Sequence, residues 1–191
     1  MPPFTDAVVD DHQEMIEYYE AYEAAKKEGD AARQGRIVRL LTWEVARHAF
    51  AEETVMYPLM EKRLADGKKL VEEDLKAHLE VKSMLSQIEN ETPGTDAYDA
   101  TVQKVWQHLK PHNDSEEKND LPQLEATFAD EAEGREYAMS FSRIKTIAPT
   151  RGHPELPNRP PFETVAGLVT APVDKIKDLF AYFPTEEDLK T

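Results

Sequence analysis

The amino-acid sequence predicts an all-α fold, an up-down four-helix bundle with an additional helix and a C-terminal docking extension. Long segments carry apolar residues near helical spacing and are separated by short turns that contain glycine or proline. No segment alternates apolar and polar residues convincingly enough to predict a strand. The pattern H-x-x-x-E-E-x-x-x-x-P occurs at residues 48–58 and again at 112–122, which indicates two matching halves.

Each expected helix begins or ends at a recognisable signal. Proline is expected to kink or interrupt two of them, the second at Pro58 and the fourth near Pro111 and Pro122. Three residues stand at expected N-cap positions, namely Thr5, Thr95 and Asp130. The expected helices cover about residues 5–28, 31–64, 68–90, 96–128 and 130–147.

The composition changes after residue 147. Residues 148–161 hold five prolines and are expected to form an extended strap along the surface. Two short amphipathic pieces are expected to follow around Pro172, and their apolar content favours docking on the bundle over a free tail. Their apolar residues are Val165, Leu168, Val169, Val173, Ile176, Leu179, Phe180 and Phe183. The predicted organisation is a helical bundle over residues 1–147 and a docked extension over 148–191.

Charge and composition exclude several classes of function. A net charge of -15 argues against nucleic-acid binding, which needs basic surface to neutralise phosphate, and it disfavours anionic membranes. No stretch is apolar enough to span a bilayer, and the N-terminus lacks the features of a signal peptide. Because there are no cysteines, disulfides and thiolate metal sites are excluded. We expect a cytoplasmic protein without nucleic-acid or membrane partners.

The repeated motif has the spacing of a metal-binding face. Residues four apart lie on the same face of a helix, so His48 can act with Glu52, and His112 with Glu116. Four histidines fall one on each of the first four expected helices: His12, His48, His78 and His112. Successive pairs lie symmetrically about the intervening turns, so in an up-down bundle they should meet at one level.

The same residues are expected to point into the bundle. The residue three positions before each of the four histidines is apolar. Any one of them alone would fit a core histidine satisfied by a neighbour. Burying all four together with two glutamates would cost roughly 1–3 kcal/mol for each unpaired group, and a metal centre removes that cost. Six nitrogen and oxygen donors exceed what one tetrahedral zinc uses and suit two octahedral metal ions.

These residues resemble the duplicated H…HxxxE motif of haemerythrin-like HHE cation-binding domains, over about residues 5–128. The proline-rich strap and the segment after it are similar to the C-terminal tails of fungal members. The resemblance implies a four-helix bundle around two non-haem iron ions joined by an oxo or hydroxo bridge. It implies that Glu52 and Glu116 bridge the irons. It also implies that His12 and His48 serve one iron, and His78 and His112 the other.

The sequence departs from the oxygen-carrying haemerythrins at one position. Those have an H-x-x-x-H pair on the third helix, where His78 is followed by Lys82. The corresponding pair here is His108 and His112, and Glu44 occupies the position in the first half that His108 occupies in the second. Glu44 and His108 are therefore candidate additional ligands.

Other polar residues receive structural interpretations. Glu53 and Glu117 are expected to lie off the ligand face, in helix packing or solvent. His153, in the strap, is expected to be exposed. The tryptophans and tyrosines are expected in the core or at its rim rather than in redox chemistry.

Three classes of function remain open. A binding protein would take up O₂ reversibly, or store or sense iron. An enzyme would decompose peroxide or reduce NO at the same irons, and an interaction module would use the metal only structurally. An open coordination position would separate the first two classes from the third, with O₂, peroxide, NO or azide-like anions as ligands. The sequence does not identify a protein partner.

Overall fold

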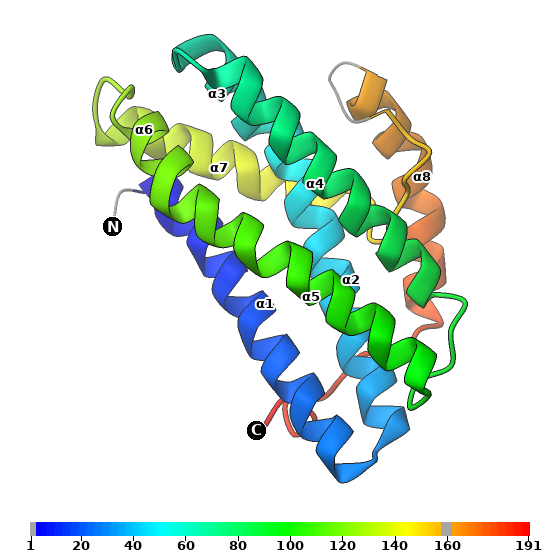
Figure 1. Ribbon diagram of the computed structural model, residues 1–191. Helices are drawn as coiled ribbons and strands as arrows, with labels where there is room; N and C mark the ends of the chain where they lie inside the picture. Colours follow the sequence, from blue (N-terminus) through cyan, green and yellow to red (C-terminus); the bar gives the residue numbers. More distant parts are fainter. Residues whose placement is uncertain (1–2, 158–161) are drawn as a thin grey trace.

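Four long helices form an up-down bundle in the computed structural model, which describes residues 3–157 and 162–191 (Figure 1). Across this described part there is no strand, in agreement with the predicted all-α class. The four helices are α1 (Pro3–Glu28), α2 (Ala31–Ala51), α4 (Gly67–Ile88) and α5 (Asp96–Ser115). None of the helices within the described ranges is long and apolar enough to cross a membrane.

The helix starts follow local capping chemistry. The side chain of Asp30 accepts a hydrogen bond from the Arg33 amide at the start of α2, and Thr95 does the same at α5. Gly29 and Gly94 precede these caps with φ of 72° and 81°, a conformation that only glycine adopts without strain. The predicted cap Thr5 lies inside α1 instead, where its amide and hydroxyl both donate to the Glu125 carboxylate.

Two of the bundle helices continue through π-helical turns. The turn η1 (Glu52–Met56) joins α2 to α3 (Tyr57–Arg63), and η2 (Glu116–Asp120) joins α5 to α6 (Leu121–Glu125). Each π turn begins at the motif glutamate and ends just before the motif proline. The expected long second helix therefore exists as a continuous helical path with one widened turn.

Pro111 does not interrupt α5, contrary to the sequence prediction. A proline removes one backbone hydrogen bond and leaves the carbonyl four residues earlier without its partner. Pro111 and Gln107, which carries that carbonyl, are both exposed. Water can satisfy the freed carbonyl there, so the helix persists.

The core is divided into two apolar clusters by a buried polar layer. One cluster contains Tyr22, Ile37 and Leu85, and the other contains Phe4, Met60 and Phe141, all at most 1% exposed. Complete burial of such side chains stabilises the fold by roughly 1.5–3 kcal/mol each. The four motif histidines lie between the two clusters, so the helices are fixed both above and below them.

A fifth long helix, α7 (Glu131–Ile147), covers α1 and α2 at one end of the bundle. Asp130 caps it by accepting from the Glu133 amide, as the sequence predicts. Phe141 inserts its ring into the core beside Phe4, with the ring centroids 6.1 Å apart. Lys145, in the last turn, reaches the acidic side chains between α1 and α2.

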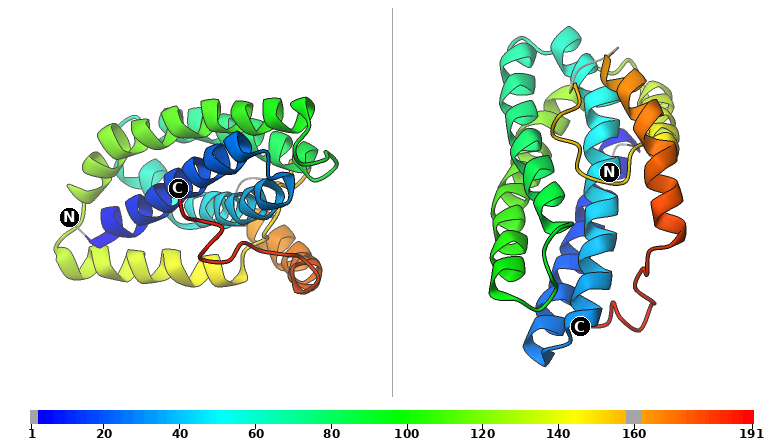
Figure 2. Two further views of the ribbon diagram at one scale, coloured as in Figure 1. Left: turned by 90° about the horizontal axis from the view of Figure 1, so that it is seen from below. Right: turned by 90° about the vertical axis from the view of Figure 1, so that its right-hand side faces the viewer.

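The C-terminal extension runs back along the bundle. The described part of the strap (148–157) crosses α2 and α4 and leads to α8 (Phe162–Leu179), one helix containing Pro172 rather than two pieces (Figure 2). The last residues return to the start of α2, where Arg36 forms a two-bonded ion pair with Asp188.

Among the side chains that the structure describes, those that hold α8 are not the apolar ones named from the sequence. Gly167, Ala171 and Asp174 face the bundle, and Asp174 accepts from the Thr150 amide and contacts His153. This polar anchor fixes the rotation of the helix and turns its apolar stripe outward. The exposed members of that stripe are Val169, Val173, Ile176, Leu179 and Phe180. The side chains of Val165 and Leu168 lie outside the described part, and Phe183 packs edge-on against Trp43.

Candidate metal centre

Four imidazoles meet in the middle of the bundle, one each from α1, α2, α4 and α5. His12, His48, His78 and His112 are all buried, with at most 9% exposed. The Nε2 atoms of His12 and His48 lie 3.1 Å apart, and those of His78 and His112 lie 3.0 Å apart. The histidines thus form two facing pairs, as their spacing about the turns predicts.

The other ring nitrogen of each histidine faces a carboxylate. An Nδ1–H that donates to a carboxylate leaves the Nε2 lone pair directed into the centre. The Nδ1–oxygen distances are 2.9 Å for His12–Glu117, 2.9 Å for His48–Asp11, 2.7 Å for His78–Glu53 and 3.7 Å for His112–Asp74. Two lone pairs facing each other at about 3 Å repel unless a cation or a proton lies near them.

Glu52 and Glu116 lie between the two histidine pairs and are fully buried. Both oxygens of Glu52 and one of Glu116 have no hydrogen-bond donor. Each carboxylate instead directs one oxygen toward each pair of imidazoles. The oxygen–Nε2 distances are 3.0 Å to His48 and 3.3 Å to His78 from Glu52, and 3.7 Å to His12 and 3.4 Å to His112 from Glu116.

The six side chains therefore form two groups of four donors that share both glutamates. In each group the donor atoms lie within 4.8 Å of one another. One group contains His12 and His48, and the other contains His78 and His112. Acceptor atoms that converge without donors are the arrangement that a cation satisfies, so the residues fit a metal centre.

The pKa shifts of the two glutamates also fit a site that holds positive charge. Burial, together with the charge of Glu52, raises the pKa of Glu116 well above its ordinary value. Burial also acts to raise the pKa of Glu52, but the adjacent imidazoles of His48 and His78 outweigh it and hold that pKa well below its ordinary range. Two carboxylates in one dry site repel each other, and positive charge on either side relieves both.

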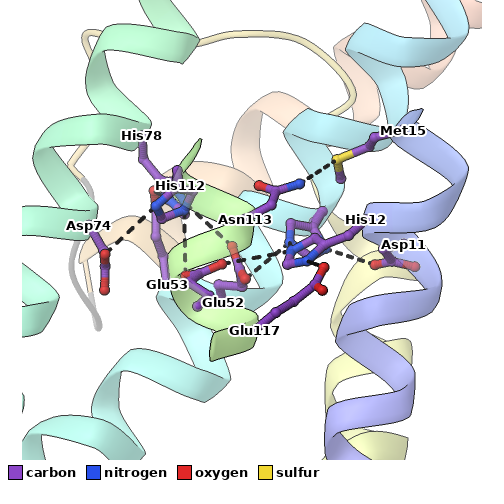
Figure 3. Close-up of polar contacts among 12 residues, drawn as sticks. Asp11, His12, Met15, Glu52, Glu53, Asp74, His78, His112, Asn113 and Glu117 are labelled. Atoms are coloured by element: carbon purple, nitrogen blue, oxygen red, sulfur yellow. Dashed lines mark hydrogen bonds and ion pairs between the residues drawn. The ribbon is translucent and has the colours of Figure 1, made fainter. Parts of the chain in front are cut away.

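The two π turns bring a second glutamate into each half. Because the Tyr57 amide bonds to the carbonyl of Glu52 five residues back, the widened turn lets neighbouring residues face the centre together. Glu53 accepts from His78, and Glu117, in the equivalent turn, accepts from His12 (Figure 3). The expectation that Glu53 and Glu117 lie only in helix packing or solvent is wrong. The signal was present, since the second glutamate and the proline recur in both motifs.

Two further carboxylates complete the surroundings of the histidines. Asp11 contacts His48 and also Lys145 of α7, while Asp74 faces His112. Burial, with the charge of Asp120, raises the pKa of Asp74 to about 7. Asp11 precedes His12 by one residue, whereas Asp74 precedes His78 by four. The two aspartates therefore share no repeated pattern from which the sequence could have predicted them.

Tyr57 adds an oxygen to one half alone. Its hydroxyl lies 2.9 Å from Nε2 of His78 and donates to Glu116 at 3.2 Å. Burial and the charge of Glu116 raise the pKa of Tyr57 well above its ordinary value. The equivalent residue of the second motif is Leu121, so the duplication gave no hint of this tyrosine.

The two additional candidate ligands lie outside the cluster. The carboxylate of Glu44 is buried between α2 and α7, where it pairs with Lys145 and Arg47. His108 is 45% exposed, with Nδ1 donating to the Lys104 carbonyl at 2.8 Å. The expectation that either extends the ligand set does not fit the structure. His153 is also not exposed as expected, because only 20% of its side chain is accessible and it contacts Asp174.

Comparison with known proteins identifies the family. Residues 4–124 match the model of the Hemerythrin HHE cation binding domain. The chain belongs to the haemerythrin HHE family. An uncharacterised hemerythrin-like protein of Schizosaccharomyces pombe is 38% identical over 186 residues, covering 96% of this chain and 89% of the relative. No solved structure matches the chain significantly.

Membership agrees with the fold and the site. The matched residues include all four buried histidines and both buried glutamates. This haemerythrin-like domain is thus an all-α cation-binding bundle whose core His and Glu side chains are placed for a metal centre. The match ends before α7 and the C-terminal extension, while the likeness to the yeast relative continues across most of the chain.

Proposed function

We propose that this protein is a non-haem di-iron protein that binds a small ligand such as O₂ at the centre of its bundle. The observation that carries the proposal is the pair of four-donor groups that share Glu52 and Glu116. His12 and His48 would hold one iron, and His78 and His112 the other, with the two carboxylates bridging. A pair of irons supplies reversible electron transfer to a small ligand, which closed-shell zinc does not.

The donor set supports iron over other metals. It contains imidazole and carboxylate but no thiolate, which disfavours copper(I) and iron–sulfur clusters. Six donors distributed over two positions leave each ion short of six protein ligands. Because Glu44 and His108 are engaged elsewhere, they do not fill the remaining positions.

The rest of the chain prepares this centre without entering it. Glu53, Glu117 and Asp11 fix three of the histidine rings by hydrogen bonds at Nδ1, so these imidazoles need not reorganise when metal binds. Asp74 faces the fourth, His112, at 3.7 Å. The apolar clusters on both sides exclude bulk water from the layer. Such a dry, pre-arranged site suits a small neutral ligand better than a bulky substrate.

Metal analysis and azide binding test the proposal. The purified full chain should contain about two irons and show near-ultraviolet absorption from the oxidised centre. Azide should then add a visible absorption band, because at least one coordination position remains open. One zinc per chain, or no metal after expression in iron-rich medium, would overturn the di-iron proposal. Two irons that respond neither to azide nor, when reduced, to NO would replace ligand binding with storage or a structural role.

Peroxide decomposition or NO reduction at the same centre is the alternative activity. The proposal of reversible binding predicts that the reduced protein recovers its spectrum after a cycle of oxygenation and deoxygenation. Steady turnover of peroxide or NO with a matched electron donor would favour the enzyme instead.

A further inference from the structure

The groove between α2 and α4 is closed by the C-terminal extension rather than by the two helices alone. Gly152 of the strap packs so tightly on α4 that a Cβ there would lie 2.4 Å from the Lys82 carbonyl oxygen. Gly167 of α8 packs on α2 in the same way, since a Cβ there would lie 2.3 Å from the Phe50 ring. Figure 2 shows the strap and α8 beside these helices. Together they form a roof over the groove.

Two small cavities lie in succession beneath this roof. The outer cavity, of about 20 Å³, is bounded by Leu156 and Pro157 of the strap and by Phe50. The inner cavity, of about 10 Å³, has His48, His78 and His112 among its lining residues. A space of this size has room for about one water-sized molecule.

Ala46 and Lys82 line both cavities and so mark the place where the two cavities adjoin. Ala46 presents a single methyl group from α2. Lys82, from α4, bonds through its ammonium to Glu53, which in turn accepts from His78. The Lys82 side chain is only 14% exposed, so the partition that it forms with Ala46 opens when its ammonium leaves Glu53, a change of side-chain rotamer that needs no movement of the backbone.

The residues that line the inner cavity indicate which kind of ligand can pass through it. Apart from the histidines, Lys82 and Asn113, its lining is aliphatic: Val45, Ala46, Ala49, Val81, Leu85 and Leu109. An ion that enters loses hydration free energy, and an aliphatic surface offers no contacts that compensate for this loss. A neutral diatomic molecule is weakly hydrated and loses little hydration free energy on entry. The outer cavity is more polar, since Arg151 and His153 also line it, so the aliphatic inner cavity is the part of the route that favours such a molecule.

We propose that neutral diatomic ligands reach the metal centre beneath the strap, through the partition formed by Ala46 and Lys82. The proposal rests on the proposed ligand-binding function and specifies its route and ligand class. Residues at a partition control how fast a ligand enters and leaves. They do not change the affinity, because the bound and free states are the same with or without the obstacle.

Rates of NO binding to the reduced full chain test the route. In Ala46→Leu, the association and dissociation rates should both fall by about tenfold, with the dissociation constant unchanged. Leu156→Ala should widen the outer cavity and raise both rates. Ala32→Leu is the matched control, because Ala32 is exposed on the same helix. A substitution that merely disturbed the centre would change the dissociation constant.

Krypton provides a second readout that needs no reaction at the metal. Crystals of the full chain pressurised with krypton should show the gas in both cavities, and Ala46→Leu should lose the inner peak. If Ala46→Leu fails to fold, krypton uptake by the wild type and the NO rates of Leu156→Ala still test the route.

Unchanged NO rates in both variants, or krypton absent from the inner cavity of the wild type, would overturn the route. A wild-type chain that takes up krypton in both cavities but binds neither NO nor azide would leave the passage standing. That result would overturn the proposed function instead, so the two failures are distinguishable.

Discussion

The two halves of the centre have the same donors but different support. His48 is supported by Asp11, which also contacts Lys145 of α7, whereas Asp74, facing His112, contacts no lysine in the described structure. The duplicated motif therefore specifies the metal-binding donors, while an element outside the repeat, α7, makes the two halves unequal. Both halves are also tied to each other through their glutamates.

Each half supplies a glutamate that contacts a histidine of the other half, and these contacts couple the two halves physically. Glu53 belongs to the first motif but accepts from His78 of the second pair, and Glu117 belongs to the second motif but accepts from His12 of the first. The backbone turn of each half therefore orients an imidazole of the other. Loss of one half should disturb its partner, which separates this arrangement from two independent sites.

Removing a shared carboxylate should have the largest effect. Glu52→Ala removes a donor from both halves and should lose most of the iron, whereas His12→Ala should lose mainly the iron of the first half. Because metal stabilises only the folded chain, Glu52→Ala should also lower the melting temperature by roughly 5–10 °C. Iron analysis and calorimetry measure both effects.

The control for this series is His108→Ala. His108 is exposed on α5, away from both groups of donors, so the variant should keep its iron and its melting temperature. A Glu52→Ala protein with full iron, or a His108→Ala protein without it, would break the assignment of donors.

The glutamates that follow the motif glutamates should differ from each other. Glu53 is buried and also binds Lys82, whereas the Glu117 side chain is 34% exposed. Loss of a carboxylate that orients a metal-binding histidine weakens metal affinity by about 10–100-fold. We expect the loss of metal affinity to lie near the upper end of this range in Glu53→Gln and near the lower end in Glu117→Gln. Competition with a chelator measures both losses. Equal effects would show that burial does not distinguish the halves.

Tyr57 sharpens the comparison spectroscopically. Its oxygen lies beside Nε2 of His78, where it could be an additional donor to the iron that His78 and His112 would hold. The oxidised protein should then show a visible phenolate-to-iron band that disappears in Tyr57→Phe while the iron content stays the same. If the wild type lacks this band, Tyr57 serves only as a hydrogen-bond donor to Glu116.

The smallest expected effect concerns the anchor of α8. The hydrogen bond from His153 to Asp174 raises the pKa of His153 above its ordinary 6.5, and its stabilising effect is therefore complete below that pH and lost as the pH rises through the raised value. Burial acts to raise the pKa of Asp174, but His153 outweighs it and lowers that pKa, so the aspartate's contribution is lost only in acid.

Hydrogen exchange in α8 should accordingly be slower near pH 6 than near pH 9, after correction for the intrinsic pH dependence of exchange. Asp174→Asn should remove most of this difference, and His108→Ala should preserve it. An Asp174→Asn protein with the same pH dependence as the wild type would rule out this pair as its source.

The sequence was sufficient for the histidine layer because that layer depends only on spacing. Short turns place residues equidistant from them at one height, and this holds whatever the details of the loops. His108 was a candidate for another reason, its place one helical turn before His112, but the buried seam of α5 passes through Val105 and Leu109 instead, at the 3-4 spacing of packed helices. Glu44 is directed away by Lys145 on α7, a contact that no pattern within the repeat specifies.

Other features depend on backbone geometry that simple periodicity does not describe. A regular helix places Glu53 about 100° from Glu52. Here, at the start of a π turn, Glu52 lies between the histidine pairs while Glu53 reaches Nδ1 of His78. The rotation of α8 likewise follows from one buried aspartate rather than from its apolar content. In both places a local hydrogen bond outweighs the average preference of the segment.

Mössbauer spectroscopy of the protein loaded with ⁵⁷Fe tests the central claim most directly. If the chain holds one iron in each half, and Tyr57 makes the halves unequal, the oxidised protein should give two quadrupole doublets of equal area. In Tyr57→Phe the two doublets should move closer together while the total iron is unchanged. A single doublet from one iron per chain would contradict the two-site centre.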